Sequence, residues 1–299
     1  MQVSARPGPG DSLLDIKGLK VGQAEDTRVR TGTTVILPDA PVAMGVDVRG
    51  GAPGTRDTDA LDPTCLIDTF HGLVLSGGSV FGLAAADGVT AMLSSRGIGL
   101  PLGPRAVPVV PSAILFDLAN GGDKDWGDTP PYRDLGIRAL IAVGEPIRQG
   151  RAGAGYGALA GSKPGGIGTA SLVLEDGTAV AALIAVNCFG EVAPGAMQHG
   201  EVILPKLGLV GGNTTIGCVA TNATLDKAAC RRLAIMAQDG LARTIRPIHT
   251  PFDGDTIFAM ATGEKSASGP LAATLAVLGT LAADCVARAV EKAVAAATG

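Results

Sequence analysis

The chain has 299 residues, 46% of them hydrophobic, so it is long enough to bury a sizeable aliphatic core, which argues against disorder. Its formal net charge of −4 and pI near 5.4, without any block of basic residues, argue against a nucleic-acid or anionic-membrane surface. We therefore expect a small-molecule partner, no nucleic acid and no membrane. Since residues 1–18 lack an apolar signal segment, we also expect a cytoplasmic protein.

The first half of the chain mixes strand and helix signals. Residues 33–37 and 42–48 are predicted to form a pair of strands that turns at Pro38-Asp39. A helix is predicted over 79–95 with Ser79 as its cap, and a second helix over 133–143. Between them, residues 107–118 are strand-like, although two prolines limit the ladder hydrogen bonds of this stretch. Residues 117–132 are polar and rich in Gly and Pro, which indicates an exposed loop.

The second half carries clearer signals. Residues 171–174 and 179–186 flank Glu175-Asp176-Gly177, and an Asp-Gly pair between apolar runs predicts a hairpin. A strand over 215–220, a helix over 225–244, a strand over 256–262 and a helix over 271–297 follow. The apolar stretch 271–287 is interrupted by Asp284 and is too short for a membrane span. Grouped strands with grouped helices predict two sheets layered between helices in one compact unit.

Several common sites are not indicated. Five cysteines without CxxC spacing and three histidines without HExxH spacing predict neither a disulfide framework nor a metal site. The glycine-rich stretches 153–157 and 161–164 match no nucleotide-binding pattern, and 77–82 is not a serine nucleophile elbow. We therefore expect no cofactor and no metal.

The stretch Gly211-Gly212-Asn213-Thr214-Thr215, before the strand at 215–220, admits three interpretations. Asn213-Thr214-Thr215 fits a glycosylation sequon, which a chain without a signal peptide rarely uses. The stretch can also be a plain glycine turn. In the third interpretation, Thr214 attacks the carbonyl of Asn213 and cleaves the chain through an ester. The two glycines would let the backbone reach that strained geometry.

Such a cleavage would give Thr214 a free α-amine. An α-amine has a pKa of about 7.7 to 8.0, close enough to neutrality to deprotonate the hydroxyl of the same residue. One residue then supplies both the nucleophile and the base, and no histidine is needed.

Three further stretches offer groups that such a site needs. Asp253 and Asp255 stand two residues apart before a strand, either as a solvated Asp-Gly turn or as acids that orient the amine and hydroxyl. A calcium loop is disfavoured because no Glu follows at the required position. Lys163 places a cation on a glycine loop, and Asn187 places an amide at the end of an apolar strand.

Taken together, these stretches resemble the self-processing aminopeptidase/esterase family, which includes L-aminopeptidase D-amidase/esterases, β-peptidyl aminopeptidases and nylon-oligomer hydrolases. The resemblance runs through most of the chain in a fixed order, and it is carried by GLKVG at 18–22, DVRGGAPGTR at 47–56, LSGGS at 75–79 and FDGDTIF at 252–258. Their co-occurrence in this order is more specific than any one of them.

The resemblance implies an α+β fold, a four-layer αββα sandwich of the N-terminal-nucleophile-hydrolase type that forms a single catalytic domain over 1–299. It implies self-cleavage between Asn213 and Thr214, which leaves an α chain of residues 1–213 and a β chain of residues 214–299. The implied roles are nucleophile for Thr214, oxyanion or substrate donor for Asn187, holders of the amine and hydroxyl for Asp253 and Asp255, and site lysine for Lys163.

Within the family, Asn-Thr-Thr at the cut and Asp-Gly-Asp downstream look more like the nylon-oligomer hydrolase branch, which favours linear amide substrates. Phe116 stands where the aminopeptidases carry a tyrosine that helps the oxyanion, so this role would pass to Asn187 and backbone amides. Phe116 and Ser79 are candidates for the substrate pocket.

The leading hypothesis is an N-terminal threonine hydrolase that cleaves small linear amides, such as nylon-type oligomers, short peptides or β-peptides, and amino acid amides or esters. The alternatives are an aminopeptidase proper, an acyltransferase similar to the ornithine acetyltransferases, and a non-catalytic binding protein with the same fold. Because the C-terminal helix is long and apolar, we expect a homo-oligomer, a tetramer of processed heterodimers.

Overall fold

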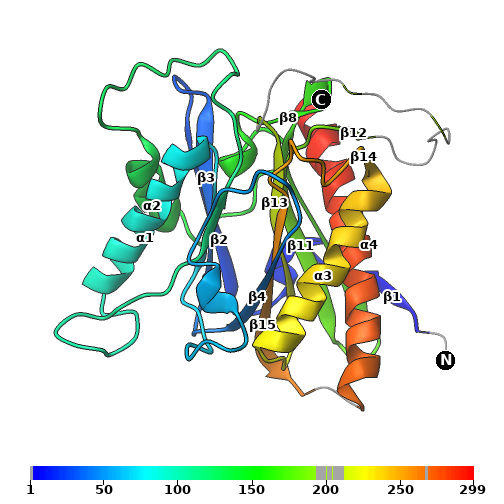
Figure 1. Ribbon diagram of the computed structural model, residues 1–299. Coiled ribbons are helices and arrows are strands. Elements are labelled where there is room, and N and C mark those ends of the chain that lie inside the picture. The colour runs from blue at the N-terminus through cyan, green and yellow to red at the C-terminus, as the bar shows by residue number, and fades with distance from the viewer. Residues whose placement is uncertain (1–2, 193–199, 201–203, 205–211, 267–268) are drawn as a thin grey trace.

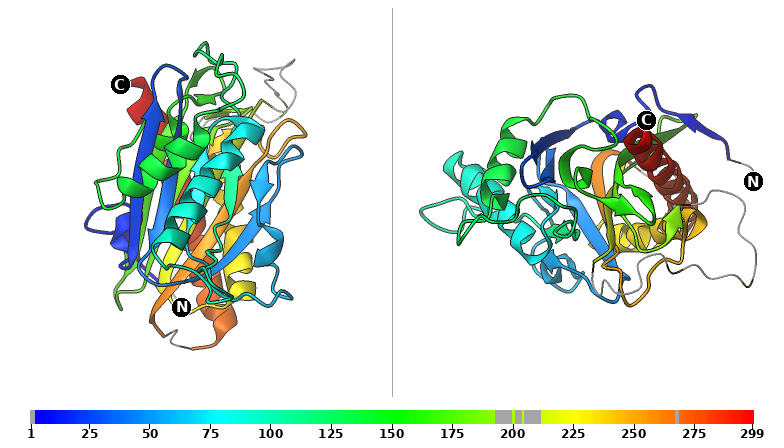
Figure 2. Two further views of the ribbon diagram at one scale, coloured as in Figure 1. Left: turned by 90° about the vertical axis from the view of Figure 1, so that its left-hand side faces the viewer. Right: turned by 90° about the horizontal axis from the view of Figure 1, so that it is seen from above.

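Two β-sheets lie face to face between two pairs of helices in the computed structural model, which describes residues 3–192, 200, 204, 212–266 and 269–299 (Figure 1). The view from above in Figure 2 shows the two helix pairs on opposite sides of the sheets. The predicted four-layer αββα sandwich is therefore confirmed.

The first sheet contains the strands that carry the candidate site. Its strand order is β1 (Ala5–Pro7), β10 (Gly166–Leu174), β11 (Ala179–Asn187), β13 (Thr214–Ala223), β15 (Thr256–Lys265) and β4 (Ala43–Val48). Helices α3 (Lys227–Thr244) and α4 (Leu271–Thr298) cover its outer face. Neighbouring strands are antiparallel except for β13 and β15, which run parallel. The predicted Asp-Gly hairpin joins β10 to β11, with Gly177 at a φ of 81°.

The second sheet has the order β2 (Leu19–Asp26), β3 (Thr31–Pro38), β6 (Leu73–Ser76), β7 (Ser112–Ile114) and β5 (Thr55–Arg56). Helices α1 (Ala84–Ser95) and α2 (Tyr132–Ile141) cover it. Two small two-stranded sheets pair β8 (Leu159–Ala160) with β9 (Lys163–Pro164), and β12 (Glu191–Val192) with β14 (Ile245–Arg246). Short 3-10 turns are η1 (Leu13–Asp15), η2 (Asp59–Leu61), η3 (Ser79–Leu83) and η4 (Gly153–Gly155).

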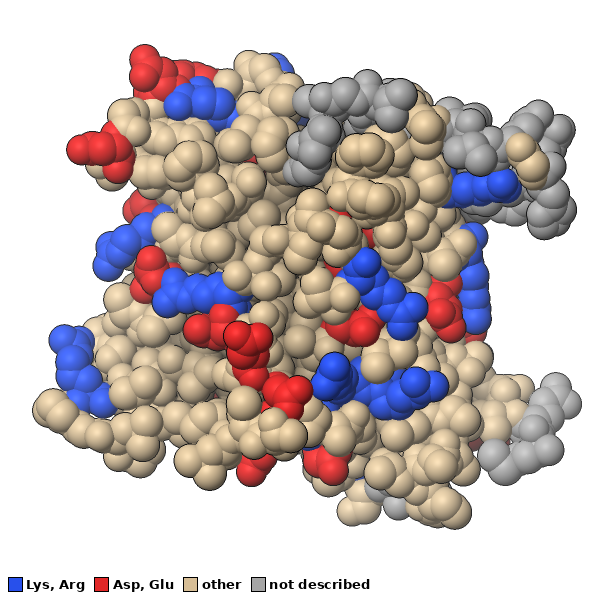
Figure 3. Space-filling model, viewed as in Figure 1, with Lys and Arg blue, Asp and Glu red and all other residues tan. Residues whose placement is uncertain are grey.

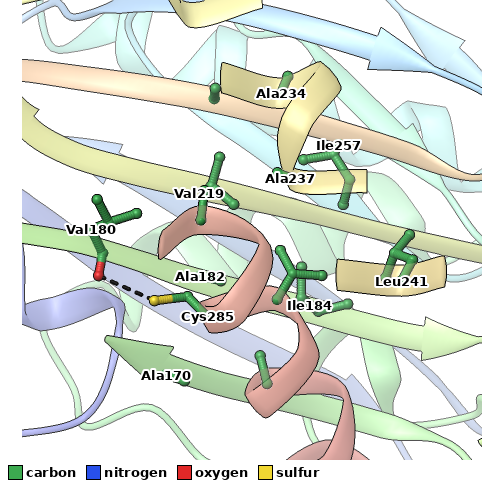
Figure 4. Packing of buried hydrophobic residues seen from close by; sticks show 14 of the residues in the cluster. Ala170, Val180, Ala182, Ile184, Val219, Ala234, Ala237, Leu241, Ile257 and Cys285 are labelled. Carbon is green, nitrogen blue, oxygen red and sulfur yellow. Dashed lines mark hydrogen bonds between the residues drawn. The ribbon is translucent and has the colours of Figure 1, made fainter. Parts of the chain in front are cut away.

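Small aliphatic side chains fill the layer between the first sheet and its helices. Val180, Ala182 and Ile184 of β11 face α4, where the Cys285 thiol donates a hydrogen bond to the Val180 carbonyl at 3.4 Å (Figure 4). Their small size lets the helices approach the sheet closely. A second apolar cluster fills the space between the two sheets, so the first sheet is buried on both faces.

Two predicted strands do not pair as expected. β3 pairs with β2 and β6, whereas β4 lies in the other sheet beside β15. The turn at Pro38-Asp39 ends β3, and residues 39–42 then carry the chain from one sheet to the other. A turn signal marks where a strand ends, but it does not specify which strand becomes its neighbour.

One other local expectation was wrong, and another held only over part of its range. Gly78, not Ser79, occupies the cap position before η3, and no side chain caps this turn. Ser79 itself has a φ of 52°. Of the strand-like stretch 107–118, only β7 pairs in a sheet, because Pro108 and Pro111 remove ladder donors before it.

Helix α4 is, within the described part of the chain, the one helix long and apolar enough to cross a bilayer by length and composition. It packs along β10, β11 and α3, and its buried face includes Ala282, Val286 and Val290. This is how a core helix packs. On the face that Figure 3 shows, acidic and basic side chains are interspersed rather than gathered into a patch of one sign.

Candidate active site

Three chain segments meet where β11 ends and β13 begins. Asn187, the last residue of β11, pairs with Thr214, the first residue of β13. Asn213 forms a parallel bridge to Asp253, just before β15. The structure thus brings together five residues singled out in the sequence, and each is at most 2% exposed: Asn187, Asn213, Thr214, Asp253 and Asp255.

The Thr214 hydroxyl lies against the peptide group that precedes it. Its Oγ1 donates a hydrogen bond to the carbonyl oxygen of Asn213. The same oxygen accepts the amide N–H of Gly254 at 3.0 Å. Gly212 precedes this peptide, and the other glycine of the predicted hinge, Gly211, lies outside the described residues.

The Asp255 carboxylate is anchored next to Thr214. Its Oδ1 accepts the Thr215 amide N–H at 2.8 Å. Its Oδ2 lies 3.1 Å from the amide nitrogen of His249 and 2.9 Å from Nδ1 of the same residue. The buried Nε2 of His249 has no hydrogen-bond partner within the described chain. The sequence interpretation, which considered the histidines only as possible metal ligands, missed this pair.

The Asp253 carboxylate is held by a different set of donors. Its Oδ1 accepts the Phe189 amide at 3.1 Å, and its Oδ2 accepts the Thr250 amide at 2.9 Å and the Thr250 hydroxyl at 2.6 Å. Burial, followed by the charge of Asp255, raises the pKa of Asp253, while the Thr250 and Phe189 donors oppose that rise. Both aspartates therefore shape the backbone around Thr214, and no hydrogen bond among the described residues joins either carboxylate to its hydroxyl.

Asn187 joins three loops. Its Oδ1 accepts the Leu159 amide at 2.8 Å, and its Nδ2 donates to the carbonyl of Phe116 at 2.9 Å and to that of Gly212 at 3.4 Å. In this arrangement the amide of Asn187 contacts the residue before Asn213, not the Asn213 carbonyl. Its role as an oxyanion donor stays a prediction.

A cavity of about 220 Å³ adjoins Asn187. Its lining includes Phe116, Asp117, Asn120, Leu159, Asn187 and Gly212. Phe116 thus lies where a pocket residue is expected, whereas Ser79 does not line this cavity and sits at the start of η3. Lys163 is exposed on β9, and no hydrogen bond or ion pair of the described chain links it to Thr214.

Asp117 was placed in an exposed loop by the sequence interpretation, but its side chain is buried. Its carboxylate accepts the Thr31 hydroxyl at 2.6 Å and the Gly78 amide at 2.8 Å. Burial raises the pKa of Asp117 to about 6, although these two hydrogen bonds oppose the rise. The signal that could have found it is a lone acid directly after the apolar run 113–116.

These residues place a buried hydroxyl, two anchored carboxylates and a backbone donor around one carbonyl oxygen. Of the described residues, no group of three or more His, Cys, Asp or Glu side chains forms a metal cluster, and His199 lies outside them. The four-layer αββα sandwich has the architecture of the N-terminal-nucleophile (Ntn) hydrolase type of fold.

Comparison with known proteins specifies the family. The model of Peptidase family S58 matches residues 11–299, so the chain belongs to this family of peptidases and is an amide hydrolase by family. An uncharacterized aminopeptidase of Mycobacterium tuberculosis is 41% identical over 94% of this chain and 92% of its own length. A 6-aminohexanoate-oligomer endohydrolase of Kocuria sp. is 30% identical over 91% of this chain and 82% of its own.

Two solved structures share the fold. The L-aminopeptidase D-Ala-esterase/amidase of Ochrobactrum anthropi, described as a variant of the Ntn hydrolase fold, matches with a TM-score of 0.77 at 24% identity, over 99% of this chain and 89% of that chain. A Burkholderia sp. beta-aminopeptidase matches with a TM-score of 0.75 at 23% identity, over 99% and 90%. The family resemblance found in the sequence is confirmed.

Proposed function

We propose that the protein is a self-processing amide hydrolase whose nucleophile is Thr214. The observation that carries this proposal is the contact between the Thr214 hydroxyl and the carbonyl of Asn213. In the cleavage, Oγ1 bonds to the carbonyl carbon, the C–N bond to Thr214 breaks, and the hydroxyl proton passes to the leaving nitrogen. Water then hydrolyses the ester and releases residues 1–213 from residues 214–299.

After self-cleavage, Thr214 also acts as the nucleophile in the hydrolysis of substrates. The freed α-amine of Thr214, with a pKa of about 7.7 to 8.0, takes the proton from Oγ1 as the hydroxyl attacks a substrate amide. The acyl group is transferred to Oγ1, the amine product leaves with the proton, and water releases the acid. Asp253 and Asp255 keep the loop around the nucleophile in place through their backbone donors.

We propose small linear amides as substrates. The cavity beside Asn187 has apolar walls at Phe116 and Leu159, and its 220 Å³ suit a short unbranched acyl chain. The Kocuria relative is named for hydrolysis of 6-aminohexanoate oligomers, which are linear amides. An aminopeptidase proper is the second candidate, because the mycobacterial relatives carry that name.

Mass spectrometry of the purified protein tests the first step. We expect two fragments that separate between Asn213 and Thr214 in the wild type, and an intact, inactive chain in Thr214→Ala. Thr214→Ser retains a hydroxyl on the same carbon and should still cleave. An intact wild-type chain that hydrolyses amides would refute the proposal.

A substrate panel tests the second step. Linear amide oligomers and peptides would be supplied with a free or an acetylated terminal amine. Equal hydrolysis of both forms supports an oligoamide hydrolase, whereas a strict need for the free amine supports an aminopeptidase. Analytical ultracentrifugation of the same material tests the proposed homo-oligomer.

A further inference from the structure

The amide N–H of Gly254 points at the oxygen of the proposed scissile peptide. It donates to the Asn213 carbonyl at 3.0 Å. We propose that this N–H is the oxyanion donor of self-cleavage, and that it receives the carbonyl oxygen of the substrate once Asn213 has left. This inference rests on the proposed cleavage between Asn213 and Thr214.

The distance suits the role. A donor that stabilises a tetrahedral intermediate should lie about 2.7 to 3.1 Å from the oxygen that becomes negative. Among the described residues, two hydrogen bonds reach the Asn213 oxygen, one from Thr214 Oγ1 and one from Gly254. The hydroxyl must release its proton as it attacks, so its own bond to that oxygen is lost. The Gly254 bond persists and strengthens as charge develops.

The Gly254 amide is held rigidly from both sides. The Asp253 carbonyl accepts the Ala52 amide at 2.8 Å, and the Asp255 carbonyl accepts the Arg49 amide at 2.9 Å. The Gly254 carbonyl accepts the Thr256 hydroxyl at 3.0 Å. A donor that is already fixed in place needs no reorganisation when the negative charge appears, which is the condition for strong electrostatic stabilisation.

The absence of a side chain at position 254 also fits this role. A Cβ built on Gly254 would lie 2.7 Å from Thr214 Oγ1 and 2.7 Å from the Ala52 carbonyl oxygen. A side chain would therefore push the hydroxyl away from the Asn213 carbonyl or move the donor itself. The glycine between the two aspartates lets the backbone approach the reacting atoms directly.

The flanking aspartates acquire a positioning role from this geometry. Asp253 is tied to Phe189 and Thr250, and Asp255 to Thr215 and His249. Each carboxylate thus anchors one of the two residues that flank Gly254.

Replacing the Gly254 amide by an ester tests the proposal directly. Glycolic acid at position 254, introduced into the full chain by cell-free translation, removes the N–H and adds no atoms beside Thr214. We expect cleavage to slow by about 10²- to 10³-fold, the usual loss for one oxyanion donor. The matched control is glycolic acid at Gly177, whose N–H donates to the Leu174 carbonyl at 2.9 Å in the distant hairpin. It should cleave at the wild-type rate.

The outcomes separate this inference from the proposed function. A wild-type chain that does not cleave between Asn213 and Thr214 refutes both. A wild-type chain that cleaves, together with a Gly254 ester that cleaves within about threefold of the Gly177 control, overturns only the oxyanion role.

A second measurement applies if the Gly254 ester does not fold, as judged by thermal unfolding against the Gly177 control. In the uncleaved Thr214→Ala chain, labelled with ¹⁵N at Gly254 and ¹³C at the Asn213 carbonyl, NMR detects coupling across a hydrogen bond. Coupling between these two nuclei supports the proposal, and its absence overturns it.

Discussion

Nδ1 of His249 lies 2.9 Å from Oδ2 of Asp255, and Oδ1 of the same carboxylate accepts the Thr215 amide. One side chain therefore links a histidine in the loop before β15 to the residue that follows Thr214. Within the described residues, His249 makes no hydrogen bond to the Asn213-Thr214 peptide, so we predict that it acts through Asp255 as a positioning residue.

His249→Ala should slow self-cleavage by about 10- to 100-fold. A hydrogen bond to a charged group contributes about 1.5 to 3 kcal/mol, and its loss would loosen Asp255. His249→Asn places an amide donor near the position of Nδ1 and should restore most of the rate. His71→Ala is the control, since that histidine accepts the Val109 amide in the other half of the fold. Gel densitometry measures the cleavage rate. If His249→Ala cleaves at the wild-type rate, the positioning role is contradicted.

The buried Asp117 carboxyl should make stability depend on pH. Its pKa is raised from 3.8 to about 6, so the folded state binds this proton more tightly than the unfolded state does. The resulting stabilisation is complete below about pH 4 and is lost as the pH rises through about 6. At 1.36 kcal/mol per pKa unit, the loss is up to about 3 kcal/mol.

Urea unfolding of the wild type and Asp117→Asn at pH 4.5 and 7.5 measures this effect. The free energy of unfolding of the wild type, relative to Asp117→Asn, should fall between the two pH values. A difference between the two proteins that is the same at both pH values would show that Asp117 does not titrate in this range.

Helix α4 lies so close to β10 that a side chain at Gly168 should lower the stability of the fold. A Cβ on Gly168 would lie 1.9 Å from the backbone oxygen of Ala289, so Gly168→Ala must push the helix outward. We expect a loss of about 1 to 3 kcal/mol in the free energy of unfolding. Gly103→Ala, with no atom within 4 Å of its Cβ, should change stability by less than about 0.5 kcal/mol. Equal unfolding midpoints for the two variants would contradict this packing.

Local sequence patterns predicted most elements of the first sheet and its helices. The Asp-Gly hairpin and the strand predicted over 215–220, which is part of β13, depend on signals within a few residues, and both are confirmed. The partners of β3 and β4 depend instead on which of two sheets each strand joins. That choice is made by tertiary packing, so the turn at Pro38-Asp39 could not reveal it.

The same distinction between local sequence signals and tertiary packing applies to the candidate site. Residue types that carry chemistry, such as Thr214 and the Asp253-Asp255 pair, were recognisable from motif and order along the chain. The N–H of Gly254 was not, because a backbone donor has no sequence signature and its direction is set by the loops around it. The burial of Asp117 and the exposure of Lys163 likewise depend on how distant loops close over them.

Asn187→Asp tests whether the side-chain amide positions the segment before the cut. The substitution keeps an oxygen for the Leu159 amide but replaces the Nδ2 donor with a second oxygen that faces the carbonyls of Phe116 and Gly212. The lost hydrogen bonds and the repulsion between oxygens should cost about 1 to 3 kcal/mol, which corresponds to cleavage slower by about tenfold or more.

A matched amide at the other end of the same two strands provides the control. Asn222 Oδ1 accepts the Ala179 amide at 2.9 Å, and its Nδ2 donates to the Gly177 carbonyl at 3.0 Å. Asn222→Asp therefore breaks a two-sided contact of the same kind, between β13 and the hairpin that leads into β11, far from Thr214. It should lower stability to a similar extent and leave the cleavage rate per folded molecule unchanged. If Asn187→Asp cleaves as fast as Asn222→Asp, the contact between Asn187 and Gly212 has no part in the reaction, and the geometry at Gly254 alone positions the scissile peptide.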